Sequence, residues 1–176
     1  MKKERRYEIQ DVKKYIEFSF VPAMREIFKA GDPKKYELFH GNCCRQTAVF
    51  ICRLLTELLP EFTWTAWGGD FKDVIMGQKC QYWHAWVYGK SNDKRYFIDM
   101  ARVLKENLFI EVESNKYPKT HKDCICMEEL SRERLDWKKM FYGEDFEFYT
   151  SLPSYKVFES ILFMTGNVDF LKQKRQ

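Results

Sequence analysis

Three residues whose types can together form a nucleophile, a base and its orienting carboxylate occur in this order along the chain: Cys44, His84 and Asp99. A thiolate beside an imidazole that a carboxylate holds is a recurring arrangement for acyl transfer through a thioester. Cys43 is the alternative nucleophile, because it directly precedes Cys44. These residues can act together only if the elements that carry them meet in the fold.

A helix is expected over about residues 43–58. Asn42 can cap its start, and Pro60 disfavours helical geometry at the residue before it. The first turn of a helix offers backbone N–H groups and a partial positive charge, which favour thiolate over thiol and can bind an oxyanion. A cysteine at this helix start is therefore well situated to be a nucleophile.

Helical spacing distinguishes the two cysteines. Apolar residues at steps of three and four form one stripe: Cys44, Ala48, Ile51, Leu55 and Leu58. That stripe should face a sheet, whereas Cys43 points about 100° away around the helix. The expected solvent side carries Arg45, Arg53 and Glu57. The spacing favours Cys44, with Cys43 kept as the alternative.

Aromatic and β-branched runs after Pro60 predict adjacent antiparallel strands: FTWTAW, QYWHAWVYG and RYFIDMA. Turn residues in 68–73 (GGDFKD) and 90–94 (KSNDK) should separate them, and residues 68–70 are expected to be a turn. The run LFIEVES at 108–114 could add another strand. Together these runs predict a small antiparallel sheet.

A hairpin with residues 89–94 as its loop would bring the acid and the base together. Tyr88 would then face Arg95, and His84 would directly face Asp99, with Cβ atoms roughly 5 Å apart. Four aromatic residues would share the histidine's face: Tyr82, Trp86, Tyr88 and Phe97. The other face would be core: Trp83, Ala85, Val87, Tyr96, Ile98 and Met100. A purely structural His–Asp bond that fixes the sheet register is the alternative interpretation.

Helical segments are expected at both ends of the chain, over 8–30 and about 127–172. Pro22 should kink or split the first segment. Gly31, able to take the left-handed conformation, should end it just before Pro33. The residues predict elements in the order helix, helix, strands, helix.

That order is typical of an α+β fold, with helices segregated from an antiparallel sheet. The length of 176 residues fits a single domain over 1–176, with its core at about 40–115. No run of about 18 apolar residues and no secretion signal occur, so we expect a soluble, cytoplasmic protein whose six cysteines are thiols. The net charge of +4 is small, and neither a nucleic acid nor a membrane is an expected partner.

The segment from 40 to 102 resembles the transglutaminase-like branch of the papain-like cysteine enzymes. In that family a cysteine opens a helix, a histidine follows on a strand within His-Ala-Trp, and an aspartate comes on the next strand. The matching motifs here are GNCCRQTAVFICRLL, HAWVYG and YFIDMA. The resemblance implies a papain-like fold in which the Cys44-bearing helix packs against the sheet. It also implies that Cys44 attacks, His84 moves the proton and Asp99 orients the imidazole.

Details of the resemblance bear on the pocket. The family's usual alanine after the nucleophile matches Ala48 if Cys44 is the nucleophile, whereas Gly41 is spaced for Cys43. Arg45 stands where the family commonly carries an aromatic residue. A second oxyanion donor or pocket residue is expected among four residues, between which the sequence does not choose: Trp64, Trp67, His40 and Gln81.

The expected function is cysteine-dependent acyl transfer, by an amide or peptide bond hydrolase or a transglutaminase-type acyltransferase. Its substrate would be a protein or peptide, with a possible amine acceptor, and no metal or organic cofactor is required. One alternative is a non-catalytic peptide-binding module on the same fold.

Two further alternatives are a zinc-binding and a nucleic-acid-binding protein. A zinc site would use four residues whose spacing is not that of a common zinc module: Cys80, His121, Cys124 and Cys126. Base stacking would use four tryptophans: Trp64, Trp67, Trp83 and Trp86. Basic residues are not interleaved with these tryptophans, which makes nucleic-acid binding the weaker interpretation.

Overall fold

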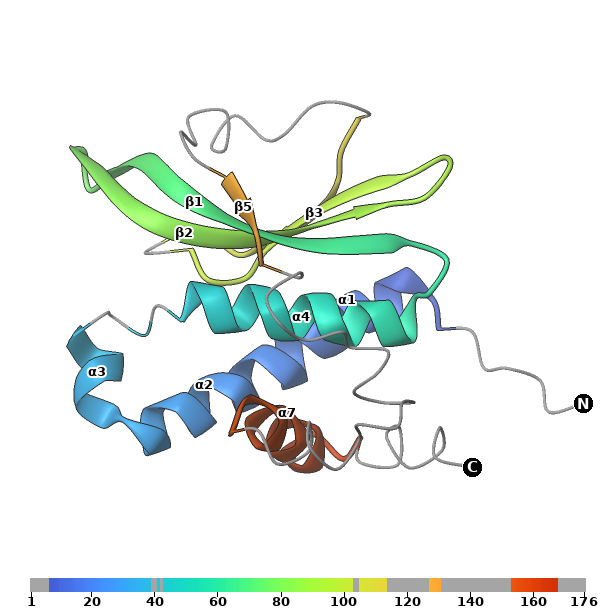
Figure 1. Ribbon diagram of the computed structural model, residues 1–176, viewed down its shortest axis with the longest axis horizontal. Helices are drawn as coiled ribbons and strands as arrows, with labels where there is room; N and C mark the ends of the chain where they lie inside the picture. Colours follow the sequence, from blue (N-terminus) through green and yellow to red (C-terminus); the bar gives the residue numbers. More distant parts are fainter. Residues whose placement is uncertain are drawn as a thin grey trace, which may run out of the picture. The chain divides into compact units, whose positions relative to one another are not determined.

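The computed structural model describes the following residues: 7–38, 41, 43–102, 105–113, 127–130 and 153–167. They form an α+β structure with one antiparallel sheet and several helices, which confirms the expected class (Figure 1). Contacts divide the chain into two compact units: Met1–Lys14 with Asn42–Ser131, and Tyr15–Gly41 with Arg132–Gln176. The prediction of a single domain over 1–176 stays a prediction.

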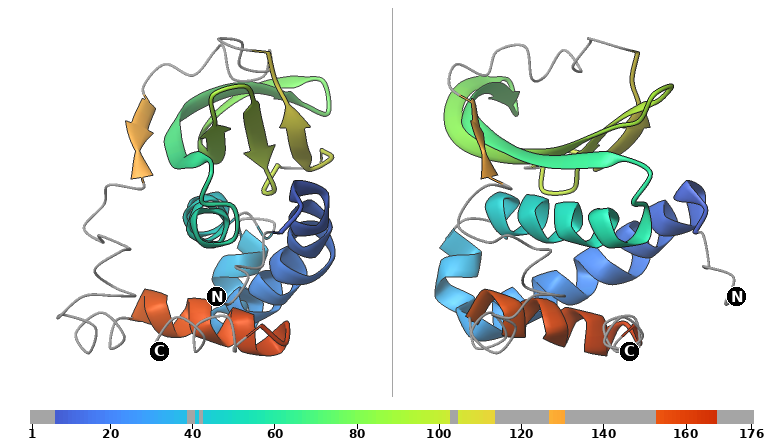
Figure 2. Two further views of the ribbon diagram at one scale, coloured as in Figure 1. Left: turned by 90° about the vertical axis from the view of Figure 1, so that its right-hand side faces the viewer. Right: turned by 45° about the vertical axis from the view of Figure 1, so that its right-hand side comes forward.

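The sheet lies in the first unit and has five strands in the order β4-β3-β2-β1-β5. All neighbouring strands are antiparallel. Their bounds are β1 Thr63–Ile75, β2 Gln78–Lys90, β3 Arg95–Asp99, β4 Leu108–Glu111 and β5 Met127–Glu129. The two long strands, β1 and β2, make a continuous hairpin that curves across the unit (Figures 1 and 2). Strand β4 confirms the expected strand near residue 108.

The turn expected at residues 68–70 is wrong, because β1 runs straight through them. The chain reverses instead at Met76 and Gly77, whose φ angles of 50° and 81° suit a two-residue hairpin turn. Gly68 was expected to form a turn, but it lies within β1 and makes room for the Trp83 side chain. A Cβ there would lie 2.3 Å from a ring carbon of Trp83, so the missing side chain permits the indole to cross the strand.

The β2–β3 hairpin is tighter than expected. Tyr88 pairs with Phe97 rather than with Arg95, so the register differs by two residues from the prediction and His84 does not directly face Asp99. The loop closes over four residues, with the Ser91 N–H donating to the Lys94 carbonyl at 2.9 Å. A shift of two residues leaves each side chain on its original face of the sheet, because the strand period is two.

Helix α4 spans Cys44–Leu58, within one residue of the expected helix. Cys43 stands at the cap position, where we expected Asn42, which lies outside the described residues. The helix contacts β1 and β2 and lies beneath the sheet (Figures 1 and 2). Its expected apolar stripe is buried: Cys44, Ala48, Ile51, Leu55 and Leu58.

The solvent side of α4 was predicted wrongly at Arg53, whose side chain is only 1% exposed. Arg45 is exposed and Glu57 half-buried, as their types suggested. The helix is buried on faces beyond its apolar stripe, since Thr47 and Phe50 are also buried. A charged residue therefore does not mark the outer side of this helix.

The N-terminal helical prediction is confirmed by three consecutive segments. They are α1 Ile9–Tyr15, the π-helical turn η1 Ile16–Phe20 and α2 Val21–Gly31. Pro22 has no N–H to donate, and the Val21 N–H bonds the carbonyl of Ile16 five residues back. The expected irregularity at Pro22 thus takes the form of a π-turn just before it.

The end of α2 differs from the prediction in its geometry. Gly31 is the last helical residue and is not left-handed; Asp32 follows in an extended conformation. Pro33 then begins a further short helix, α3 Pro33–Leu38, with the Asp32 carboxylate accepting the Lys35 N–H at 3.0 Å. Asp-Pro is here a helix start, since a capping carboxylate precedes proline at the first helical position.

The expected C-terminal helical segment is wrong at its beginning, because Met127–Glu129 forms β5 and pairs with β1. Residues 131–152 and 168–172 of the segment lie outside the described residues. Helix α7 at Pro153–Met164 confirms its helical end and packs against α2 within the second unit. Its Phe158 ring also lies 6.0 Å from the ring of Phe20, the last residue of η1. No helix in the described ranges has the length and apolarity needed to cross a membrane.

Candidate active site

Cys44 occupies the first position of α4 and faces the sheet. Its side chain is 7% exposed, its Sγ lies 4.0 Å from the Trp83 carbonyl oxygen on β2, and its thiol is close enough to the His84 imidazole to contribute to the raised pKa of that ring. The thiol of Cys43 instead lies 3.5 Å from the Thr47 hydroxyl of its own helix. The sheet-facing cysteine is therefore the one that the apolar stripe indicated.

The imidazole and the carboxylate meet despite the shifted register. His84 Nε2 and Asp99 Oδ2 are 2.8 Å apart, and both side chains are 1% exposed. The second carboxylate oxygen of Asp99 accepts the Ala101 N–H at 3.3 Å. Both oxygens are thus engaged, which fixes the carboxylate and, through it, the orientation of the imidazole.

The pKa of His84 reflects opposing influences. Burial lowers it, but the hydrogen bond to Asp99, the adjacent Cys44 thiol and the charges of both groups outweigh this desolvation and raise the pKa from 6.5 to about 9. His84 is therefore an imidazolium at neutral pH. Because Nε2 is bonded to Asp99, Nδ1 is the ring nitrogen that can exchange a proton with Cys44.

Aromatic rings surround the imidazole, as the alternation of β2 predicted. Ring centroids of Tyr82 and Trp86 lie 5.7 and 6.5 Å from that of His84. Phe71 on β1 is closer, at 5.4 Å, and sequence reasoning missed it by assigning it to a turn. The signal that could have found it is the β-branched pair Val74-Ile75, which continues the strand beyond the glycines.

A polar cluster holds Tyr82 beside the imidazole. Its hydroxyl donates to the Asp73 carboxylate at 3.0 Å, and the Lys105 ammonium bonds the other oxygen of that carboxylate. Burial, first of all, and then the hydrogen bond and charge of Asp73 raise the pKa of the Tyr82 phenol. The ring therefore stays neutral and anchored next to His84.

The other expected pocket residues are scattered. The Trp64 indole N–H donates to the Leu59 carbonyl at 3.1 Å, which argues against its use as an oxyanion donor. Trp67 directly opposes Trp86 and so shares the face of His84, whereas Gln81 is exposed on the opposite face. His40 lies outside the described residues.

The start of α4 can supply oxyanion donors from the backbone. The Thr47 N–H makes the first intrahelical bond, to the Cys43 carbonyl at 2.9 Å, and no side-chain bond caps the helix at Cys43. The N–H groups of Cys44, Arg45 and Gln46 therefore point out of the helix end, beside the Cys44 thiol. A tetrahedral oxyanion formed on that thiol would lie next to them.

Within the described ranges no cluster of three or more histidine, cysteine or carboxylate side chains could hold a metal ion. His121, Cys124 and Cys126 of the zinc alternative lie outside those ranges. Cys80 directs its thiol to the Asp73 carbonyl at 3.5 Å. The tryptophans of the nucleic-acid alternative do not form one exposed row, because Trp64 and Trp86 are buried.

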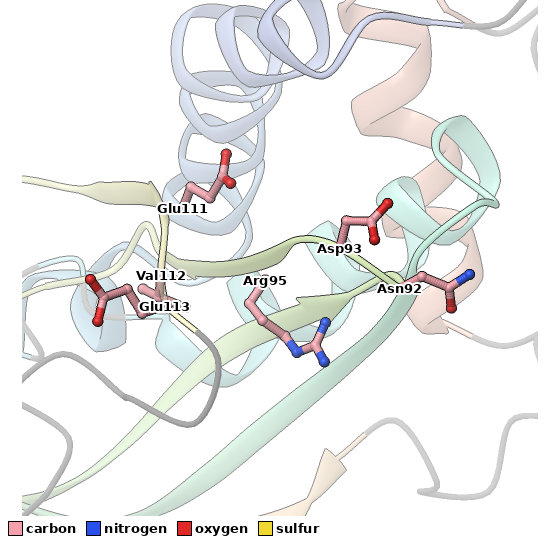
Figure 3. Close-up of a pocket in the computed structure, with 6 residues that line it drawn as sticks. All are labelled: Asn92, Asp93, Arg95, Glu111, Val112 and Glu113. Carbon is pink, nitrogen blue, oxygen red and sulfur yellow. The ribbon is translucent and has the colours of Figure 1, made fainter.

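A separate cavity of about 390 Å³ lies at the β2–β3 loop and the end of β4 (Figure 3). Its lining is mostly polar: Asn92, Asp93, Arg95, Glu111, Val112 and Glu113. No candidate site residue from the sequence lines it. Comparison with known proteins yields no match to a family model, to a curated protein or to a solved structure.

Proposed function

We propose that the protein is a cysteine-dependent acyl-transfer enzyme of the papain-like, transglutaminase-like type. The observation that supports this most is the Cys44–His84–Asp99 arrangement, with a 2.8 Å bond from the imidazole to the carboxylate and the Cys44 thiol at the helix start, close enough to the imidazole to help raise its pKa. A structural histidine bond would not require a cysteine at a helix start against the same ring. The substrate class is a protein or peptide that supplies the acyl group.

The first half-reaction follows from these positions. The Cys44 Sγ attacks the carbonyl carbon of an amide, its proton having passed to His84 Nδ1, and the carbonyl oxygen becomes an oxyanion beside the N–H groups of the helix start. The C–N bond then breaks, and the leaving amine takes the proton from His84. A thioester and a neutral imidazole remain.

The second half-reaction releases the acyl group. His84 removes a proton from water or from an amine, which attacks the thioester carbon, and the C–S bond breaks to regenerate the thiol. Water yields a carboxylic acid, and an amine yields a new amide. No step in this scheme requires a metal ion or an organic cofactor.

Iodoacetamide labelling near pH 6 with peptide mapping tests the proposal. We expect one fast cysteine among the six in the chain, Cys44, because its thiol lies at a helix start against the His84 imidazole, which can accept its proton. His84→Ala should slow it at least tenfold. Cys52 is the internal slow standard, since burial raises its pKa to about 12.

Cys43→Ala is the matched control for Cys44→Ala, because it removes the adjacent thiol and leaves the triad intact. It should keep the fast label, whereas Cys44→Ala should lose it, and circular dichroism should show both variants folded. Fast labelling that survives in Cys44→Ala would reject the nucleophile. Uniformly slow labelling of folded wild-type protein would reject the enzyme and favour a non-catalytic peptide-binding module.

A further inference from the structure

The Lys105–Asp73–Tyr82 cluster joins three segments of the first unit. Asp73 lies on β1, Tyr82 on β2, and Lys105 in the connection between β3 and β4. The Asp73 carboxylate accepts the Tyr82 hydroxyl on Oδ2 at 3.0 Å. Its Oδ1 accepts the Lys105 ammonium and the Val74 N–H, and the Asp73 side chain is only 9% exposed. The Tyr82 hydroxyl is therefore bonded to a carboxylate that a cation from another segment holds in place.

The strand register puts this cluster on the same face of the sheet as the base. Tyr82 pairs directly with Phe71 on β1, so the two side chains share a face. Asp73 is two residues from Phe71, and His84 is two residues from Tyr82. Because side chains two residues apart on a strand point to the same side, all four lie on one face of the β1–β2 hairpin.

Ring contacts connect the cluster to the imidazole. The ring centroids of Tyr82 and His84 are 5.7 Å apart and their planes meet at 75°, which is an edge-to-face contact. The Phe71 ring lies 5.6 Å from that of Tyr82 and 5.4 Å from that of His84. The phenol ring therefore contacts the base directly and also through Phe71.

One hydrogen bond does not by itself fix the plane of an imidazole. The Asp99 carboxylate holds His84 Nε2 at 2.8 Å, but the torsion that turns a histidine ring has broad energy minima, so packing has to set the ring plane. The direction of Nδ1, and with it the transfer of a proton from Cys44, depends on that plane. A ring packed edge-to-face against the imidazole, as that of Tyr82 is, restricts this rotation.

We propose that Tyr82 is a positioning residue: the Asp73–Lys105 ion pair holds its hydroxyl, and its ring keeps the His84 imidazole turned toward Cys44. The inference rests on the proposed acyl-transfer function and adds to its site a residue outside the motifs GNCCRQTAVFICRLL, HAWVYG and YFIDMA. Tyr82 acts through His84 rather than on the substrate.

The pH dependence of Cys44 alkylation tests this role. The measurement is the second-order rate constant of Cys44 with iodoacetamide at pH 6 divided by that at pH 9, where an ordinary thiol ionises without help from a histidine. Tyr82→Phe removes only the hydroxyl and should lower this ratio about fivefold, the usual effect of losing one hydrogen bond. Tyr82→Leu also removes the ring contact and should lower it about tenfold. A loss of stability alone would not change the ratio, because both rate constants come from folded protein.

The ratio reports on the thiol and the imidazole rather than on the phenol. Titratable groups face His84 from three elements: Cys44 of α4, Asp99 of β3 and Tyr82 of β2. Burial, first of all, and then Asp73 raise the pKa of Tyr82 above its ordinary value of 10, so the phenol keeps its proton at both pH values.

Tyr96→Phe is the matched control, because the Tyr96 hydroxyl also donates to a carboxylate, that of Glu111 at 3.2 Å. Tyr96 pairs with Gly89 and so lies on the face of the sheet opposite His84. Tyr96→Phe should leave the ratio unchanged.

A second variant tests whether Tyr82 acts through its bond to Asp73. Asp73→Ala removes this bond from the other side and should also lower the ratio. Adding Tyr82→Phe to Asp73→Ala should cause no further fall, since the two changes remove one shared interaction. A full further fall in the double variant would overturn the role of the ion pair.

The two proposals fail in different ways. Slow reaction of wild-type Cys44 with iodoacetamide at pH 6 would reject the acyl-transfer function. Fast wild-type reaction, together with an unchanged ratio in folded Tyr82→Phe, would reject the role of Tyr82 alone. An equal fall of the ratio in Tyr96→Phe would also reject it, because the effect would then follow from the loss of any bonded tyrosine hydroxyl.

Discussion

Two acid–base pairs in the same unit differ chiefly in burial. His84 and Asp99 join β2 to β3 at 2.8 Å with each side chain 1% exposed. Lys94 and Glu111 link the β2–β3 loop to β4 at 3.7 Å, and each is 53% exposed (Figure 3 shows Glu111 at the polar cavity). Pairs of opposite charge therefore occur in one buried and one exposed environment within the same sheet region.

The difference shows what burial adds to a charge pair. Water and salt screen the exposed pair, so its net contribution to stability is at most about 1 kcal/mol. In the buried pair the Asp99 carboxylate holds a proton on His84 up to a pKa of about 9, against the effect of desolvation. The hydrogen bond and charge of Asp99 thus keep His84 able to supply a proton at neutral pH, although burial by itself opposes this.

Removing the buried carboxylate should have the largest effect. Asp99→Ala leaves the His84 imidazole without its buried partner, so we expect a loss of about 3 to 5 kcal/mol in the free energy of unfolding at pH 6. The fast labelling of Cys44 should fall at least tenfold. Urea unfolding measures the first effect; a loss below about 1 kcal/mol would mean that the pair is not a buried ion pair.

The pH dependence of stability should be next in size. The folded pKa of His84, about 9, lies above its unfolded value of about 6.5, so the folded state binds the extra proton. This contribution is fully present below about pH 6.5 and is lost as the pH rises through about 9. It amounts to at most about 3 kcal/mol. The difference between wild type and Asp99→Asn, measured by urea unfolding from pH 5.5 to 9.5, should shrink with rising pH; a constant difference would contradict the raised pKa.

Filling the space under Trp83 should reduce the free energy of unfolding by less than removing the Asp99 carboxylate does. Gly68→Ala places a methyl group against the indole ring, which must move, so we expect a loss of about 1 to 3 kcal/mol in stability. Thermal unfolding measures the loss. Gly31→Ala is the control, because nothing lies within 4 Å of a Cβ there and the residue is helical. A Gly68→Ala protein as stable as wild type would show that Trp83 moves freely.

The exposed pair should show the smallest effect. Lys94→Gln removes one charge from a solvent-exposed contact, and we expect a change of less than about 0.5 kcal/mol in the free energy of unfolding. The iodoacetamide labelling of Cys44 should stay as in wild type. A loss above about 1.5 kcal/mol would mean that burial is not what separates the two pairs.

Local sequence patterns predicted helix α4 and its apolar stripe well, but they predicted the turn between β1 and β2 and the covered faces of α4 less well. The apolar stripe of α4 follows from helical spacing, and its C-terminal end follows from Pro60. The predicted ends of the helix differ from the observed ones by at most one residue. The glycines at 68–69 were wrongly assigned to a turn. Glycine is favoured both in a turn and in a strand where an aromatic ring crosses the backbone closely, so residue type alone does not distinguish the two. Arg53 was misassigned because residue type alone does not reveal how many faces of a helix are covered.

The sequence by itself determined which residues could share a face. Strand alternation puts His84 and Asp99 on the same side under either hairpin register, because the two registers differ by an even number of residues. The tertiary structure alone decided the actual register, through the closure of the Ser91–Lys94 loop. It also decided that Cys44 meets His84 and that the ion pair is buried, because both depend on packing between residues far apart in the chain.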